Sequence, residues 1–389
     1  MVGAPAKLPR MALNIDELRL RARRRLPRAV FDFIDGAAED EVTLRRNRAA
    51  FARHALVPRV AVDVSSVDLV TTVLGERLLA PLVLAPTGLC GMATSRGEIP
   101  AARAAADAGV RWAASCLSSV TLEEIAREAP GDHWFQLYVW KDRAFTQKLI
   151  ERAAAGGYRV LVVTLDVPVL GQRERDVRNG ATIPPRVTLR NAIDVLRCPK
   201  WLWTIWRGPP VTFANVTPAD GSATLKPFAL SPFVNSLFDP AVTWKDVEWM
   251  RRLWKGPLAV KGVMTAEDAR LSIEHGADAV IVSNHGGRQL DDAPGSLEVL
   301  PEVAEAVGSR AEVLLDGGIR RGTDMAKALA LGARACMVGR PYLYGLAAAG
   351  QSGVADAIRI LVAELRRAMA LMGCKRIGDL GPGCLRPSA

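Results

Sequence analysis

Short apolar segments alternate with amphipathic segments along most of the chain, from about residue 80 to residue 340. Each apolar segment has the length and composition of a buried strand, and most are followed by a stretch with helical periodicity. Near-continuous apolar strands separated by helices are typical of a parallel sheet that is covered on both faces. The pattern predicts strands at residues 81–85, 112–115, 134–138, 160–166, 258–261, 279–283, 313–316 and 335–338.

Eight strand–helix units over about 250 residues are the usual content of a (β/α)8 TIM barrel. An open, doubly wound sheet is the alternative. The barrel is favoured by the number of strands and by the polar residue or glycine that closes almost every one, because strand ends on one rim of a barrel converge on one pocket. We therefore predict an α/β fold in which residues 1–389 form a single barrel domain.

Two regions lie outside this alternation. Residues 14–34 have helical periodicity and predict an N-terminal helical segment that begins at the capping residue Asn14. Residues 167–243, after the fourth strand, are too many for an ordinary barrel loop and predict a long insertion. Its middle, residues 196–207, contains three tryptophans flanked by cations. This stretch is either an interfacial membrane anchor or a lid or subunit contact that buries the tryptophans.

The composition narrows the class of protein. Lys and Arg number 51 against 41 Asp and Glu, a net charge of +10, but no nucleic-acid-binding motif accompanies the charge, so we expect no nucleic acid partner. The 6 cysteines form no CxxC pair and no metal-ligand spacing with histidine, which indicates reduced thiols and no metal site. No signal peptide is recognisable, and no run reaches the roughly 18 apolar residues of a spanning helix. We expect a cytoplasmic protein in which residues 196–207 allow peripheral contact with the inner face of the cell membrane.

The stretch Ser283–Asp291 follows the sixth predicted strand and holds groups suited to catalysis. His285 offers a base that titrates near neutral pH, and Arg288 offers a planar fork that binds a carboxylate through two hydrogen bonds. Gly286 and Gly287 let the backbone approach a ligand closely. For these residues alone, a solvated glycine-rich turn is the alternative. Their position at the carboxyl end of a barrel strand favours an active site.

The loops after the last two strands are rich in glycine and lead into helices. Gly317, Gly318 and Arg320 follow the seventh strand, and Gly339 and Arg340 follow the eighth. Barrels commonly bind phosphate at these two loops through backbone N–H groups and a helix N-terminus. We therefore predict a phosphate site, with two ordinary tight turns as the alternative.

Two charged residues stand at the ends of otherwise apolar strands. Lys261 closes the fifth strand and Asp166 closes the fourth. A lysine is poorly placed in a core unless it meets a negative charge. A carboxylate can orient a histidine and stabilise its protonated form. For each of the two residues, a structural ion pair and a catalytic role remain open.

Several motifs together resemble one enzyme family. They are Ser283–Asp291, Asp316–Asp324, Gly36–Glu41, Pro86–Gly88, Trp134–Tyr138 and Arg173–Asp176. Over about residues 14–375 the chain resembles the FMN-dependent α-hydroxy acid oxidases and dehydrogenases, which include glycolate oxidase, L-lactate dehydrogenase and mandelate dehydrogenase. The resemblance implies a (β/α)8 barrel that binds FMN and oxidises an L-2-hydroxy acid to the 2-oxo acid. It also implies a homo-oligomer, because members are often homotetramers.

The resemblance implies roles for individual residues. His285 is expected to be the catalytic base, with Asp166 beside it. Arg173 and Arg288 are expected to clamp the substrate carboxylate, and Tyr138 to bond to substrate oxygens. Further substrate contacts are expected at Phe33, Gly88 and Leu117, and FMN contacts at Pro86, Thr87, Gly88, Ser115, Gln136, Thr164, Lys261, Ser283, Asp316, Gly317, Gly318, Arg320, Gly339 and Arg340.

Three positions bear on the choice of substrate and electron acceptor. Phe33 stands where many members have tyrosine, which removes a hydroxyl from the pocket and predicts a weaker grip on the substrate carboxylate. Leu117 stands where glycolate oxidases have tryptophan, which leaves room for a larger side chain, as in lactate, a longer aliphatic acid or mandelate. Gly88 is common among the dehydrogenases, whereas oxidases commonly have alanine there.

The electron acceptor is predicted from two of these features. Gly88 and the similarity of residues 196–207 to the membrane-associating segment of quinone-linked members favour a dehydrogenase that passes electrons to quinone. An oxidase that uses oxygen and produces hydrogen peroxide is the alternative. Two other classes compete with both enzymes: a flavin-free phosphate-binding barrel, such as an aldolase or isomerase, and a flavin-binding barrel without enzymatic activity.

Overall fold

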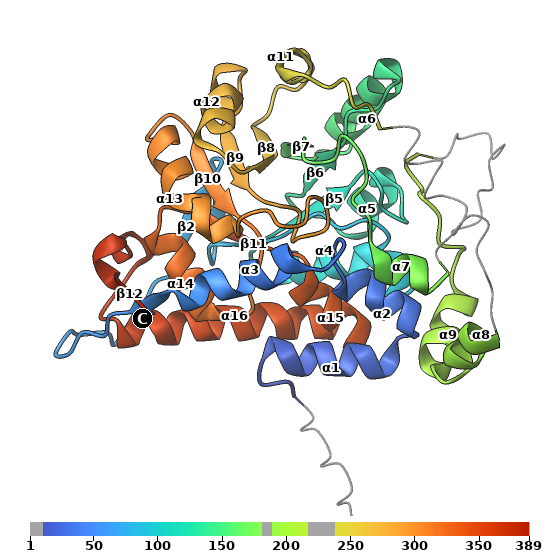
Figure 1. The fold of residues 1–389 in the computed structure, drawn as a ribbon, viewed down its shortest axis with the longest axis horizontal. Helices are drawn as coiled ribbons and strands as arrows, with labels where there is room; N and C mark the ends of the chain where they lie inside the picture. The colour runs from blue at the N-terminus through green and yellow to red at the C-terminus, as the bar shows by residue number, and fades with distance from the viewer. Residues whose placement is uncertain (1–10, 181–188, 217–237, 389) are drawn as a thin grey trace, which may run out of the picture.

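The computed structural model describes residues 11–180, 189–216 and 238–388. Its centre is a closed barrel of parallel strands in the order β4-β5-β6-β7-β8-β9-β10-β11, with β11 pairing back to β4 (Figure 1). The predicted TIM barrel is confirmed, and the open doubly wound sheet is wrong, because every strand of the barrel is paired on both sides. The strands are β4 (Leu82–Leu84), β5 (Arg111–Ser115), β6 (Trp134–Leu137), β7 (Val160–Thr164), β8 (Leu258–Val263), β9 (Ala279–Val282), β10 (Glu312–Leu315) and β11 (Ala335–Val338).

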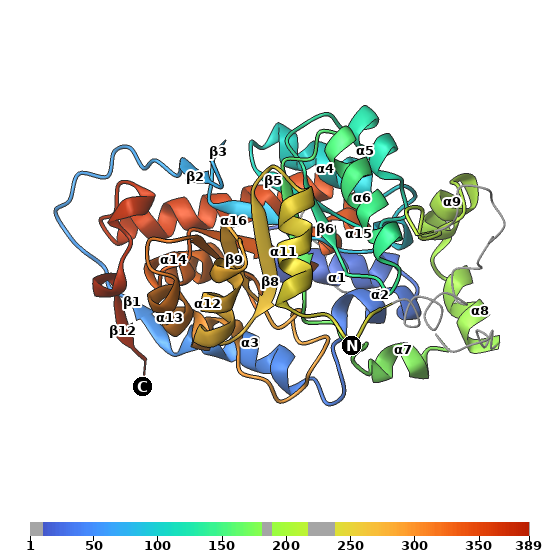
Figure 2. The same ribbon diagram turned by 90° about the horizontal axis from the view of Figure 1, so that it is seen from above.

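Helices follow the strands and cover the outside of the barrel (Figure 2). They are α4 (Glu98–Asp107), α5 (Leu122–Glu128), α6 (Arg143–Ala155), α11 (Trp244–Leu253), α12 (Ala266–Glu274), α13 (Ser296–Val307), α14 (Gly322–Ala330), α15 (Arg340–Ala349) and α16 (Gln351–Leu371). Thr121, Asp142 and Thr265 cap α5, α6 and α12, because each side chain accepts a hydrogen bond from a backbone N–H of the first turn. These caps fix where the chain turns from loop into helix.

Three helices precede the barrel: α1 (Ile15–Arg25), α2 (Arg28–Asp35) and α3 (Val42–Ala52). Asn14 caps α1 as predicted, since its side chain accepts a hydrogen bond from the Glu17 backbone at 2.9 Å. The buried face of α1 packs on α15. The turn between α2 and α3 reaches the loop after β9, where the Ala38 N–H donates to the Gly287 carbonyl at 2.8 Å. The N-terminal segment therefore forms part of the wall around the carboxyl ends of the strands.

The amino ends of the barrel strands are closed by a hairpin of β2 (Thr71–Val73) and β3 (Glu76–Leu78). Val73, Leu74 and Leu78 form one buried cluster with side chains that fill the barrel interior, among them Trp134 and Ile281. The interior is therefore a packed core, which leaves a ligand site to the loops at the carboxyl ends of the strands. A second pair of strands, β1 (His54–Leu56) and β12 (Leu385–Pro387), joins the segment after α3 to the C-terminal end of the chain.

The predicted insertion contains α7 (Glu174–Arg178), α8 (Leu189–Leu196) and α9 (Pro199–Arg207), ahead of α11. In both views α8 and α9 project from one side of the barrel (Figures 1 and 2). Within the residues that the structure describes, no helix is long and apolar enough to cross a membrane.

Candidate active site

A cavity of about 600 Å³ lies at the carboxyl ends of the strands, between the barrel loops, α2 and α9. Most predicted site residues line it: Phe33, Pro86, Thr87, Gly88, Ser115, Leu117, Tyr138, Arg173, Lys261, His285, Arg288, Asp316, Gly317, Gly318, Arg320, Gly339 and Arg340. The other four lie behind this wall, each bonded to or paired with a lining residue: Gln136 with Ser115, Thr164 and Ser283 with Lys261, and Asp166 with His285. The structure thus brings all the predicted site residues together.

His285 and Asp166 form a hydrogen-bonded pair at the cavity, with Nδ1 of the imidazole 2.9 Å from Oδ1 of the carboxylate. Two backbone features place the ring: His285 has φ of +57°, which is unusual for a residue with a side chain, and its N–H donates to Ser283 Oγ at 3.1 Å. When Nδ1 donates its proton to Asp166, Nε2 keeps a lone pair. The pair therefore presents a base to the cavity.

The charges around His285 favour its neutral form. Burial lowers the pKa of His285, the positive charges of Lys261 and Arg173 act in the same direction, and Asp166 opposes them. Burial favours the neutral form of Asp166 as well, but its interaction with His285 and the positive charge of Lys261 hold the pKa of this carboxyl below its usual value. An ionised carboxylate therefore supports a neutral imidazole, which is the state a general base requires.

Lys261 is buried at β8 and sits between two acidic residues. Its Nζ lies 3.1 Å from Asp316 Oδ2 and 2.7 Å from Ser283 Oγ. Burial alone would lower the pKa of Lys261, but the carboxylates of Asp316 and Asp166 raise it. The structural ion pair considered for Lys261 is therefore present, and the lysine still lines the cavity with its positive charge.

Arg173 and Arg288 bring two positive charges to the same cavity. Burial lowers the pKa of both guanidinium groups, and for Arg288 the neighbouring charges of Arg173 and Arg340 lower it further. Arg288 Nη1 donates to the carbonyl oxygens of Phe33 at 2.8 Å and Gly36 at 3.0 Å. Among the described residues, neither arginine has an ion-pair partner within 4.0 Å. The charge of Asp176 raises the pKa of both, but no described carboxylate touches either guanidinium, so these two half-buried cations make a site for an anion.

Arg340 is held by backbone carbonyls rather than standing free over the glycine loops. Its Nε donates to Asp35 O at 3.2 Å, Nη1 to Gly286 O at 2.9 Å and Nη2 to Gly36 O at 2.7 Å. A guanidinium has five N–H donors, so two remain for a ligand. Gly36 O accepts hydrogen bonds from both Arg340 and Arg288. The turn after α2 therefore holds two arginines of the site at once.

The glycines of the β10 loop have a packing role that the sequence did not reveal. Gly317 and Gly318 have φ of +101° and +84°. A Cβ on Gly318 would lie 2.1 Å from the carbonyl oxygen of Asn47 in α3, and one on Gly317 would lie 2.7 Å from Ser296 Oγ. The glycines therefore let this loop pass close to α3, and they also leave its backbone open to a phosphate at the cavity.

Several buried polar atoms lack a partner in the part of the chain that the structure describes. Gln136 Nε2, Thr164 Oγ1 and Asp316 Oδ1 are buried and make no hydrogen bond there. Unpaired buried polar groups are costly, so native proteins satisfy them with a ligand or with water. These donors and acceptors, together with Lys261 and the glycine loops, fit the polar edge, hydroxyl chain and phosphate of FMN.

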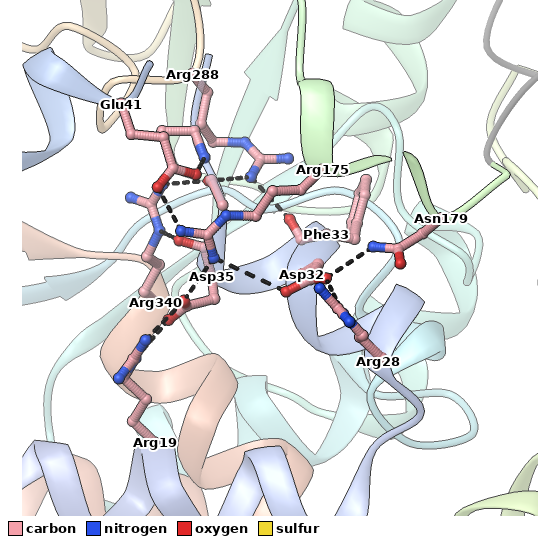
Figure 3. A network of polar contacts seen from close by, with 12 residues as sticks. Arg19, Arg28, Asp32, Phe33, Asp35, Glu41, Arg175, Asn179, Arg288 and Arg340 are labelled. Carbon is pink, nitrogen blue, oxygen red and sulfur yellow. Dashed lines mark hydrogen bonds and ion pairs between the residues drawn. The ribbon is translucent and has the colours of Figure 1, made fainter. Parts of the chain in front are cut away.

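A network next to the cavity was not predicted from the sequence. Arg175 of α7 contacts three carboxylates of the N-terminal segment, those of Asp32, Asp35 and Glu41 (Figure 3). Burial favours the neutral form of Asp35, but hydrogen bonds from Arg19 and Tyr344 lower its pKa to about 2. The motifs that contain Gly36–Glu41 and Arg175 were visible, but nothing in the sequence said that they meet.

The tryptophans of α9 divide between two surroundings. Trp201 lines the cavity with Ile205, and its indole N–H donates to Met92 O at 2.8 Å. Trp203 and Trp206 are 52% and 72% exposed and stack on each other at 5.6 Å. Within one chain, α9 therefore covers the cavity with Trp201 and leaves Trp203 and Trp206 exposed, and the membrane anchor and the subunit contact both stay predictions for these two.

Known proteins resemble this chain in sequence and in fold. The putative L-lactate dehydrogenase of Mycobacterium tuberculosis is 42% identical over 95% of this chain and 88% of its own. The L-lactate oxidase of Nostoc sp. is 46% identical over 95% of this chain and 96% of its own. The crystal structure of the monotopic membrane protein (S)-mandelate dehydrogenase superposes with a TM-score of 0.92, at 39% identity, over 97% of this chain and all of that one.

The family model described as FMN-dependent dehydrogenase matches residues 22–387. This range contains the whole barrel, the cavity and every predicted site residue. The match confirms the resemblance and the cofactor FMN, and the flavin-free phosphate-binding barrel is wrong. The chain belongs to the FMN-dependent dehydrogenase family.

Proposed function

We propose that this chain uses FMN to oxidise an L-2-hydroxy acid to the 2-oxo acid, with His285 as the base. One observation carries the proposal: the His285–Asp166 pair opens into the same cavity as two half-buried arginines whose guanidinium groups have no carboxylate within 4.0 Å among the described residues. A hydroxy acid offers a carboxylate for the arginines and a proton for the base. The names of the lactate- and mandelate-oxidising relatives are consistent with this substrate class.

FMN supplies a two-electron acceptor when it is bound. Ser115, Gln136, Thr164 and Lys261 would hold its ring, together with the backbone of Pro86–Gly88. Ser283, Asp316, Gly317, Gly318, Arg320, Gly339 and Arg340 would hold its ribityl chain and phosphate. The positive charge of Lys261, which is buried with Asp316 and Asp166 nearby, would offset negative charge that develops in the cavity.

The chain's own residues orient the acid and move its proton. Arg173 and Arg288 grip the carboxylate and fix the α-carbon in place. Burial raises the pKa of Tyr138, so its hydroxyl stays protonated and can donate to a substrate oxygen. The substrate loses two electrons and two protons: His285 Nε2 accepts one proton, and the other would leave with the electrons to the acceptor that FMN supplies. The ionised Asp166 stabilises the resulting imidazolium.

The substrate pocket has room for a side chain larger than that of glycolate. Leu117, Leu89 and Met92 give the cavity an apolar wall, and Trp201 of α9 faces it. Gly88 packs tightly against this wall, because a Cβ there would lie 3.0 Å from Leu117 Cβ. We expect higher kcat/KM for L-lactate, L-2-hydroxyoctanoate or L-mandelate than for glycolate, and a panel of these acids measures it. Equal or higher kcat/KM for glycolate would contradict this assignment of Leu117.

Quinone is the proposed electron acceptor, on the basis of Gly88 and of the exposed apolar face of α9. Reduced holoenzyme mixed with air-saturated buffer in a stopped-flow instrument is expected to reoxidise far more slowly than it turns over with a soluble quinone analogue. Reoxidation by oxygen at the turnover rate, with release of hydrogen peroxide, would establish the oxidase alternative.

Helices α8 and α9 are the proposed contact with a membrane surface. Leu196, Trp203 and Trp206 are 69%, 52% and 72% exposed, and Lys200 and Arg207 flank the tryptophans. Apolar side chains beside cations suit the interface of an anionic bilayer. The protein is expected to sediment with anionic phospholipid vesicles, and less so at high salt.

The matched variants for this membrane contact are Trp203→Ser with Trp206→Ser, and Leu371→Ser, which removes an apolar side chain that is 66% exposed at the end of α16. The double variant is expected to lose sedimentation, and Leu371→Ser to keep it. Equal sedimentation of all three proteins would show that α9 is not the contact.

A further inference from the structure

The segment 166–178 carries two groups of the site and has little regular structure of its own. Asp166 stands at its start, Arg173 lies just before α7, and α7 itself has only 5 residues. Asp166 bonds to His285, and Arg173 acts together with Arg288 on the substrate carboxylate. Both His285 and Arg288 are on the loop after β9. Arg173 and Arg288 are like charges that repel each other, and the Asp176 carboxylate of α7, which attracts both, touches neither. Other contacts must therefore hold segment 166–178 in place.

Gln289 fastens the first half of segment 166–178. Its Nε2 donates to the carbonyl oxygens of Asp166 at 3.1 Å and Val169 at 2.9 Å, and its Oε1 accepts from the Gly171 N–H at 3.3 Å. A Cβ on Gly171 would lie 2.5 Å from Arg288 O and 2.7 Å from Gln289 Cα. The two loops therefore touch backbone to backbone, and a single amide side chain joins them.

Arg175 fastens the second half of the segment. Its guanidinium contacts Glu41 and lies 3.2 Å from Asp35 and 3.8 Å from Asp32 (Figure 3). These carboxylates are themselves anchored: Glu41 Oε1 accepts from the Ala37 N–H at 3.0 Å, and Asp35 Oδ1 accepts from the Tyr344 hydroxyl at 2.7 Å.

The α2–α3 region therefore acts on both arginines of the clamp. It holds Arg288 directly, through the carbonyl oxygens of Phe33 and Gly36. It holds Arg173 indirectly, through Arg175, which lies two residues further along in α7, and through the Glu39 N–H, which donates to Gln172 O at 2.8 Å.

We propose that Gln289 and Arg175 are positioning residues that set the separation of Arg173 and Arg288, and thereby the affinity of the site for a carboxylate. The proposal rests on the clamp role given to the two arginines above. A bidentate arginine–carboxylate contact depends strongly on geometry, so a small displacement of Arg173 weakens binding without removing the base. Gln289 borders the cavity but its amide is bonded to backbone groups, and the guanidinium of Arg175 is paired with three carboxylates outside the cavity.

The test measures oxalate binding to holoenzyme from the perturbation of flavin absorbance, alongside KM, kcat, FMN content and Tm. The variants are Gln289→Met and Arg175→Gln, with Arg175→Lys as the conservative partner. Arg178→Gln is the matched control, because Arg178 lies on the same short helix but is 72% exposed and pairs only with Glu174 among the described residues. Each test variant loses contacts that hold segment 166–178, so the Kd for oxalate and KM are expected to rise on the order of tenfold.

Oxalate affinity reports positioning of the arginines, whereas FMN content and Tm report general support of the fold, so the expected pattern separates the two. Arg175→Lys recovers part of the affinity, Arg178→Gln matches the wild type, and kcat, FMN content and Tm stay close to wild type in all four proteins. Wild-type oxalate affinity in both Gln289→Met and Arg175→Gln would overturn the proposal. So would a loss of affinity that follows FMN loss and a lowered Tm. If the wild-type holoenzyme itself neither binds oxalate nor is reduced by any hydroxy acid, the proposed function fails instead.

Discussion

Replacing His285 with asparagine is expected to lower kcat/KM for the hydroxy acid by roughly 10²–10⁴-fold, the range typical of a lost general base. Asparagine keeps a polar side chain of similar reach that can still bond to Asp166, so FMN is expected to stay bound. The measurement is the rate of flavin reduction after anaerobic mixing with substrate.

The pH profile gives a second readout of the same residue. A base acts in its neutral form, so kcat/KM of the wild type falls as the pH drops through the pKa of His285 and is level above it. Because burial, Lys261 and Arg173 lower that pKa, the fall is expected below the ordinary range of histidine. His275→Asn is the control, since His275 bonds to Glu248 on the outside of the barrel and is expected to change neither quantity. If His285→Asn kept both the wild-type rate of flavin reduction and the fall of kcat/KM at low pH, another group would be the base.

Replacing Lys261 with methionine is expected to lower the free energy of unfolding by about 3–5 kcal/mol, the usual effect of breaking one side of a buried ion pair. Methionine fills the space of the lysine stem but leaves the buried Asp316 without its cation and removes one of the two donors to Ser283 Oγ. The loss of a donor and a charge at the cavity is also expected to weaken FMN binding. Urea unfolding and flavin content after dialysis measure the two effects.

The control for this substitution separates burial of a charge from loss of a cofactor contact. The double variant Lys261→Met with Asp316→Leu also removes the carboxylate that contacts the lysine directly, so part of the lost stability is expected to return while FMN binding stays weak. A single variant Lys261→Met that is as stable as the wild type and holds FMN equally well would contradict the role given to this lysine.

The barrel and its rim were predictable because the strands appear in the sequence as apolar runs and the rim residues appear at the ends of those runs. A parallel sheet that is covered on both faces produces apolar runs such as Val160–Thr164, and the strand count then selects the barrel. Strand ends on one rim meet, which is why His285 and Asp166 could be placed together although 119 residues separate them. The individual roles of these residues came from the family resemblance and stay predictions until the variants are measured.

The contacts that hold the site in place left no such signal. The Gln289 side chain bonds to Gly171 across 118 residues, and Arg175 reaches Glu41 across 134. Neither sequence separation belongs to a repeating pattern, so neither contact could be predicted from the sequence. The carbonyl partners of Arg340 were equally hidden, because a backbone oxygen looks the same at every position of a sequence.

The orientation of α9 was predictable in principle. Trp201 and Ile205 are four residues apart, which puts them on one helix face, and both line the cavity. Trp203 and Trp206 fall on another face and are exposed. Treating residues 196–207 as one unit, either buried or membrane-facing, hid this division.

The most direct test of the proposed function is anaerobic mixing of purified holoenzyme with L-lactate, L-2-hydroxyoctanoate and L-mandelate, followed by the visible absorbance of the flavin. The predicted result is loss of the oxidised-flavin band with at least one L-acid, formation of one 2-oxo acid for each FMN, and no reaction with the D-acid. A flavin that stays oxidised with every acid of the panel, in protein that retains FMN, would contradict the proposed chemistry and favour a flavin-binding barrel without this activity.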